Sequence, residues 1–84
     1  MPLVLFIHGW RFFFYANENN EPMHIHCVKA EKECKFWIDE KQYEIKEAYC
    51  FNMNSNDKRI VRKIIFEYFD SIVQEWNQFE ERKK

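Results

Sequence analysis

The sequence has 84 residues, of which 46% are hydrophobic and 19% aromatic, and its formal net charge is −1. This length allows one small domain, residues 1–84, in which aromatic side chains supply much of the core. The near-zero charge excludes the chain-wide basic field typical of nucleic-acid-binding proteins. No apolar run approaches the roughly 20 residues of a membrane span.

The three cysteines, Cys27, Cys34 and Cys50, are an odd number and contain no C-x-x-C pair. This pattern is a poor disulfide framework and predicts reduced thiols. The apolar run at residues 3–7 is too short for a secretory signal peptide and lacks a basic segment before it. We therefore expect a soluble cytoplasmic protein that does not associate with a membrane.

The first half of the chain predicts β-strands, with Gly9 in a tight turn or bulge between the first two. A polar loop at 17–22 follows the second strand, and a short turn at Glu31-Lys32 joins the third to the fourth. Residues 39–53 leave two alternatives open, a short edge strand or an irregular crossover. The four expected strands are Leu3–His8, Trp10–Ala16, Met23–Lys29 and Glu33–Ile38.

From Asn54 onward the apolar residues recur at spacings of one, three and four, which predicts one long amphipathic helix over about 55–81. Asn54 or Ser55 is the expected N-cap, with Asp57 in the first turn. Trp76 and Phe79 extend the apolar stripe and are expected to be buried. The predicted fold is α+β: an antiparallel sheet of about four strands within residues 3–49, followed by one long C-terminal helix packed on one face. The stripe comprises Ile60, Val61, Ile64, Ile65, Tyr68, Phe69, Ile72, Val73, Trp76 and Phe79.

Alternation along the strands assigns side chains to the two faces of the sheet. A two-residue turn at Glu31-Lys32 would pair His26 with Trp37. The face away from the helix collects aromatic, imidazole and cationic groups, so we expect it to be an exposed contact surface. The residues expected under the helix are Phe12, Phe14, Ile25, Cys27, Phe36 and Ile38. The candidate binding residues on the other face are Arg11, Phe13, Tyr15, His24, His26, Lys35 and Trp37.

Several alternatives remain for this face. The His24-x-His26 pair suits a metal, but it lacks further ligands on its own face, so we expect no metal and no cofactor. The two histidines are otherwise packing residues or partner-binding groups. In a ribonuclease, His24 and His26 would be acid and base, with Arg11 stabilising charge. The aromatic side chains would stack on bases, centre a protein interface or form a second small core.

The start of the predicted helix carries four cations, which oppose the helix macrodipole. Together with free amide groups they are candidates for an anion site. The alternative is a solvated surface of mixed charge. The four residues are Lys58, Arg59, Arg62 and Lys63.

Four ordered motifs cover nearly the whole chain: R-x-x-x-Y-x-N-E at 11–18, P-x-H-x-H at 22–26, K-F-W-I-D at 35–39 and W-N-x-F at 76–79. In this combination the chain resembles the small bacterial family of domain of unknown function 4160. The chain departs from the family pattern in two places: Met23 stands where a second proline is common, and Cys50 stands where glycine often precedes Phe51. The resemblance implies a gene pair of toxin–antitoxin type and hence a protein partner, but it carries no agreed activity.

These observations together predict a protein-binding module in a two-gene pair of toxin–antitoxin type. The alternative is a nucleic-acid-binding protein or a His-dependent ribonuclease that uses the same face of the sheet. A weaker alternative is a protein that binds a small ligand or a metal. The sequence leaves a homodimer open and does not specify which member of a pair the chain would be.

Overall fold

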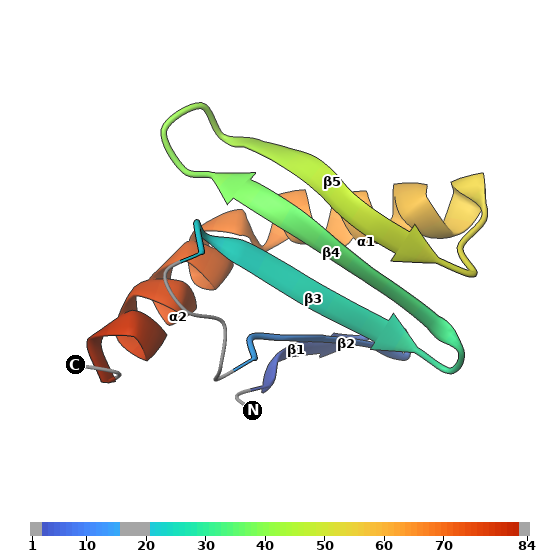
Figure 1. Cartoon of the computed structure of the whole chain (residues 1–84), viewed down its shortest axis with the longest axis horizontal. Helices are drawn as coiled ribbons and strands as arrows, with labels where there is room; N and C mark the ends of the chain where they lie inside the picture. Colours follow the sequence, from blue (N-terminus) through green and yellow to red (C-terminus); the bar gives the residue numbers. More distant parts are fainter. Residues whose placement is uncertain (1–2, 16–20, 83–84) are drawn as a thin grey trace.

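In the computed structural model, which describes residues 3–15 and 21–82, five β-strands are followed by two α-helices (Figure 1). The strands lie in sequence order in one antiparallel sheet, so that each pairs with the next strand in the chain. The α+β class is therefore confirmed. The strands are β1 Leu3–Ile7, β2 Trp10–Phe13, β3 His24–Lys29, β4 Lys32–Asp39 and β5 Glu44–Phe51.

The fifth strand corrects the expectation of about four strands. β5 pairs with β4 along its whole length, but a β-bulge interrupts the pairing near Ala48. Glu47 lies opposite Phe36 and Tyr49 lies opposite Lys35, so Ala48 is the extra residue. The bulge breaks the alternation that would have marked residues 44–51 as a strand.

Two tight turns set the register of the sheet. His8 and Gly9 both have positive φ, 51° and 82°, as the type I′ turn of a two-residue hairpin requires. The next hairpin turns at Ala30 and Glu31, because Lys29 pairs with Lys32. Its turn lies one position earlier than predicted. The expected pairing of His26 with Trp37 is therefore wrong, although the face of each residue is unchanged.

The helical region consists of α1, Ser55–Glu67, and α2, Phe69–Arg82, and not of one long helix. The break falls at Tyr68, whose ψ of 25° departs from helical geometry. Tyr43, in the turn before β5, packs on this break: its ring lies 4.2 Å from that of Phe69 between centroids, and its hydroxyl donates to the Phe66 carbonyl. A side chain bonded to a helical carbonyl competes with the helix's own hydrogen bonds. Neither helix has the length and apolar composition required to span a membrane.

The start of α1 is capped as predicted. Asn54 accepts a hydrogen bond from the Asp57 amide at 2.7 Å, and the Asp57 carboxylate accepts one from the Asn54 amide at 3.2 Å. This reciprocal pair is a capping box. The same carboxylate binds the Lys32 ammonium at 3.0 Å. The hydrogen bond from Lys32, together with the one from the Asn54 backbone, holds the pKa of Asp57 below its ordinary value.

Both helices lie on the same side of the sheet, behind it in Figure 1, and leave the other face without a helix. All six side chains predicted to lie under the helix are buried there. Trp76 is 7% exposed, which confirms its predicted burial, while Phe79 is half-buried. The core also contains Trp10, Cys34, Val61, Ile64, Ile65, Phe69, Ile72 and Val73.

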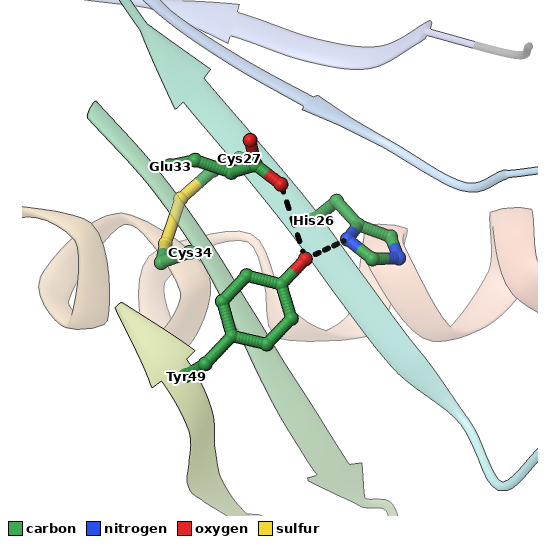
Figure 2. The surroundings of a disulfide bond; sticks show 5 residues. All are labelled: His26, Cys27, Glu33, Cys34 and Tyr49. Atoms are coloured by element: carbon green, nitrogen blue, oxygen red, sulfur yellow. Dashed lines mark hydrogen bonds between the residues drawn. A yellow bond between two sulfur atoms is a disulfide. The ribbon is translucent and has the colours of Figure 1, made fainter. Parts of the chain in front are cut away.

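The prediction of three reduced thiols is wrong for two of them. Cys27 and Cys34 lie directly opposite each other on β3 and β4 and are joined by a disulfide (Figure 2). Counting cysteines could not reveal this pairing, because it depends on where the hairpin turns. Cys50, opposite Cys34 on the next strand, is a free thiol. Burial, and then the nearby Glu47 carboxylate, raise the pKa of Cys50 to about 11.

Candidate functional site

The face of the sheet opposite the helices is here called the open face. Every candidate binding residue that is paired between strands has its side chain on this face. Successive pairings place one row of side chains across all five strands: Phe6 pairs with Arg11, Arg11 with Val28, Val28 with Glu33, and Glu33 with Phe51. We call these five residues the cross-sheet row. Since neighbouring strands lie about 4.8 Å apart, the row extends over about 19 Å.

The cross-sheet row is the most exposed apolar feature of the open face. Phe6 is 64% exposed and Phe51 is 66% exposed, one at each edge of the sheet. Arg11 between them is exposed, and Val28 and Glu33 are half-buried. Arg11 is the one member that the sequence singled out. Phe6, Val28 and Phe51 were missed. Alternation with Leu5 and Cys27 would have assigned Phe6 and Val28 to this face, but the bulge at Ala48 removes that signal for Phe51.

A second row, beside the first, forms a small aromatic cluster. Phe13 pairs with His26, His26 with Lys35, and Lys35 with Tyr49. The rings of Phe13 and His26 are stacked with centroids 5.7 Å apart, and the ring of Tyr15 meets His26 edge-on at 4.5 Å. Phe13, His26 and Lys35 are buried, whereas Tyr15 and Tyr49 are exposed at the margin of the cluster.

The expected exposed patch of His24, His26 and Trp37 is not exposed. His24 is 0% exposed, His26 is 3% exposed and Trp37 is half-buried. The pairing of β2 with β3 stops at Phe13 and His26, so at this end of the sheet His24 also reaches α2. Its ring packs edge-on against Trp37 at 5.5 Å and against Trp76 of α2 at 5.0 Å. Alternation correctly gave the face of each residue, but it contains no information on which neighbours cover that face.

Polar contacts hold this cluster in place. The Nδ1 atom of His24 lies 2.8 Å from the Pro22 carbonyl oxygen, so Nδ1 carries the proton and donates. The Lys35 ammonium binds the Glu21 carboxylate at 2.7 Å and lies 4.4 Å from the centroid of the Trp37 ring. Lys35 is therefore neutralised by an ion pair and is a packing residue in this arrangement.

Tyr49 links the two rows through its hydroxyl (Figure 2). The hydroxyl donates to the Glu33 carboxylate at 3.1 Å and lies 3.5 Å from Nδ1 of His26. The hydroxyl of Tyr49 thus contacts both the Glu33 carboxylate and the His26 ring. Glu33, in the cross-sheet row, is thereby connected to the buried cluster.

The residues that a ribonuclease would need do not converge. His24 and His26 are adjacent, with ring centroids 5.2 Å apart, but both are buried. Arg11 lies in the other row, opposite Val28. A substrate would have to displace the aromatic cover to reach either imidazole.

The four cations near the start of α1 do not form one anion site. The Lys58 ammonium lies 3.5 Å from the Glu47 carboxylate, and Arg59 donates to the Asn56 side chain at 2.8 Å. The Arg62 guanidinium lies 5.8 Å from the Phe36 ring centroid, and Lys63 lines a cavity further along the helix. The capping box uses the Asp57 amide of the first turn, and it supplies negative charge there through the Asp57 carboxylate.

Within residues 3–15 and 21–82, no group of three or more His, Cys, Asp or Glu side chains is placed to hold a metal ion. The neighbouring imidazoles of His24 and His26 thus have no third ligand among these residues.

Comparison with known protein families identifies the family of the chain. The model of the family described as domain of unknown function (DUF4160) matches residues 9–77. The chain belongs to this family. No curated protein and no solved structure matches it significantly. The matched segment contains β2 to β5, α1 and more than half of α2, so the aromatic cluster lies within the family domain, whereas Phe6 of the cross-sheet row precedes it.

Proposed function

We propose that this protein is a protein-binding module whose partner contacts the cross-sheet row on the open face. The observation that carries the proposal is the pair of exposed phenylalanines, Phe6 and Phe51, at the two ends of one row. A single exposed apolar residue needs no explanation, but two that end one row across a face without a helix would serve a partner as two anchors.

The charge of the row favours a protein over a nucleic acid. Arg11 and Glu33 are the two charged members and have opposite signs, so the row has no net charge to attract phosphates. Aromatic side chains and arginine are the residues that dominate protein interfaces. A partner with apolar side chains at its centre and a charged group toward Arg11 would complement this surface.

The buried cluster has a supporting role in this proposal. Phe13 and His26 fix the ring of Tyr15, and Tyr49 holds the Glu33 carboxylate. A partner would therefore meet a surface whose side chains are already ordered, which lowers the entropy cost of association. The predicted binding residues Phe13, His24, His26 and Lys35 would then act beneath the interface and not within it.

The family resemblance, with the gene pair of toxin–antitoxin type that it implies, supports a partner encoded beside this chain. We propose that it is the protein product of the neighbouring gene. Coexpression of the two genes with a tag on this chain should yield a complex that survives purification at high salt. Phe51→Ser should lose the partner, whereas the control Lys46→Ser, on the same strand and face but about 16 Å away, should retain it.

The same experiment separates the alternative function. A nucleic-acid complex would weaken steeply as salt rises, because phosphate contacts release counterions. Copurified nucleic acid that is lost at high salt, with no protein partner at any salt concentration, would favour nucleic-acid binding and overturn the proposal. Growth arrest on expression of this chain alone would identify it as the toxic member of the pair.

A further inference from the structure

A cavity of about 340 Å³ lies on the helix side of the sheet, between the β1–β2 turn, the end of β3 and the second half of α1. It is separate from the open face, so it is independent of the proposed protein interface. Its volume is at the lower end of the range for small-molecule sites, which is about 300–1,000 Å³.

The floor and walls of this cavity are largely apolar. Trp10 and Ile64 belong to the buried core and present one side to the cavity, while Ile60 and Tyr68 are half-buried beside them. With Ile7, the lining has two aromatic rings and three branched aliphatic chains, which suit a flat, apolar body of about one ring in size.

The rim of the cavity is cationic. Lys29 and Lys63 are both exposed and line the cavity from opposite elements, the end of β3 and α1. Neither forms an ion pair with another described residue. Glu67 is the single carboxylate of the lining, so two ammonium groups and one carboxylate leave a net charge of +1 when His8 is neutral. This balance favours an anion with one negative charge.

The fold holds Lys29 at this rim. Its ammonium lies 5.7 Å from the centroid of the Trp10 ring, within cation–π range. A Cβ atom on Gly9 would lie only 3.1 Å from Cε of Lys29, so the glycine in the turn gives the lysine chain room to cross it. The positive φ of Gly9 is required by the same turn.

We propose that this cavity binds a small monocarboxylate with an aromatic or similarly flat apolar body. The body would pack against the half-buried Ile60 and Tyr68, and the carboxylate would lie between the ammonium groups of Lys29 and Lys63. An apolar pocket with a few charged groups at its mouth is the usual composition of a small-ligand site.

The test is a titration of the ¹⁵N-labelled full chain with 3-phenylpropionate, followed by NMR. Saturable shifts should concentrate at the Trp10 indole, Ile64 and Tyr68. The uncharged 3-phenylpropionamide should bind at least tenfold more weakly, and Lys29→Gln and Lys63→Gln should each weaken the acid at least fivefold. The control Lys46→Gln, on the open face, should have no effect.

Three outcomes would overturn the proposal: no saturable shifts, equal binding of the acid and its amide, or shifts centred elsewhere. A short peptide that ends in phenylalanine, with a free or an amidated C-terminus, distinguishes the source of the carboxylate. If the free-carboxylate peptide binds at least tenfold more tightly than 3-phenylpropionate, the site recognises a protein C-terminus and the assignment to a small molecule is wrong. Lys29 and Lys63 are exposed, so their variants should keep the circular dichroism of the parent.

Discussion

Phe6 on β1 and Phe51 on β5 project from the same face of the sheet at its two opposite edges. Their backbones are connected through three intervening strands, and the residues between them in the row are Arg11, Val28 and Glu33. Burial of each phenylalanine by a partner would contribute on the order of 1.5–3 kcal/mol. The arrangement therefore gives a small sheet two separated apolar anchors with opposite charges between them.

Trp76→Ala should lower the free energy of unfolding by about 3–5 kcal/mol, the usual range for truncation of a core aromatic residue. Trp76 joins α2 to the sheet, with ring centroids 5.2 Å from Phe14 and 5.0 Å from His24. Urea denaturation measures the change, and Asn77→Ala, at an exposed position, is the control. A Trp76→Ala protein that unfolds at the same urea concentration as the parent would contradict the placement of α2.

Much of the fold could be predicted because the alternation is regular in β2, β3 and β4. Ile25 and Phe36 were correctly assigned to the core, and the opposite face of His24 and His26 was also correct. The register could not be predicted, since moving a hairpin turn by one position keeps every face and changes every pair. His24, not His26, thus lies opposite Trp37.

The missed features have local physical causes. The bulge at Ala48 removes the alternation from β5. The apolar stripe continues through Tyr68 and Phe69 without a proline or glycine, so the helix break has no signal in the sequence around it. Its observed neighbour is Tyr43, a residue of a distant turn. The exposed ends of the candidate site were missed because Phe6 and Phe51 lie on strands at the edges of the sheet, where burial depends on the whole topology.

The pairing of Cys27 with Cys34 predicts that the native protein, unfolded without reductant, exposes one titratable thiol. Reduction before unfolding should raise the number to three and lower the free energy of unfolding by about 2 kcal/mol, since the disulfide closes a short loop. Mass spectrometry after alkylation counts the thiols. Three alkylated cysteines in protein that has never been exposed to reductant would show that the bond is absent.

The remaining thiol, Cys50, should react slowly in the folded protein. Burial raises its pKa to about 11, and the thiolate is the reactive species. At pH 8 its alkylation by iodoacetamide should be about a hundredfold slower than that of the same residue in urea, where the pKa is ordinary. The rate should continue to rise up to about pH 11, and a plateau near pH 9 would contradict the raised pKa.

Acid should weaken the Asp57–Lys32 contact. The pKa of Asp57 is lower in the folded protein than in the unfolded chain. The contact therefore stabilises the fold at pH values above the pKa of Asp57 in the unfolded chain, and this stabilisation is lost as the pH falls through the pKa of Asp57 in the folded protein. Between pH 5 and pH 2, Asp57→Asn should therefore lose less stability than the parent. Lys32→Gln should show a similarly flattened dependence, because it removes the largest cause of the shift. Parallel losses in all three proteins would place the acid sensitivity elsewhere.

The most direct test of the proposed interface is the affinity for the protein encoded by the neighbouring gene, measured by titration calorimetry. Phe51→Ser and Phe6→Ser should each raise Kd about thirtyfold, equivalent to about 2 kcal/mol, as interface anchors do. Both variants should melt within a few degrees of the parent, because the two side chains are exposed, and Lys46→Ser should bind normally. If both phenylalanine variants fold and bind with unchanged Kd, the cross-sheet row is not the interface and the central claim is wrong.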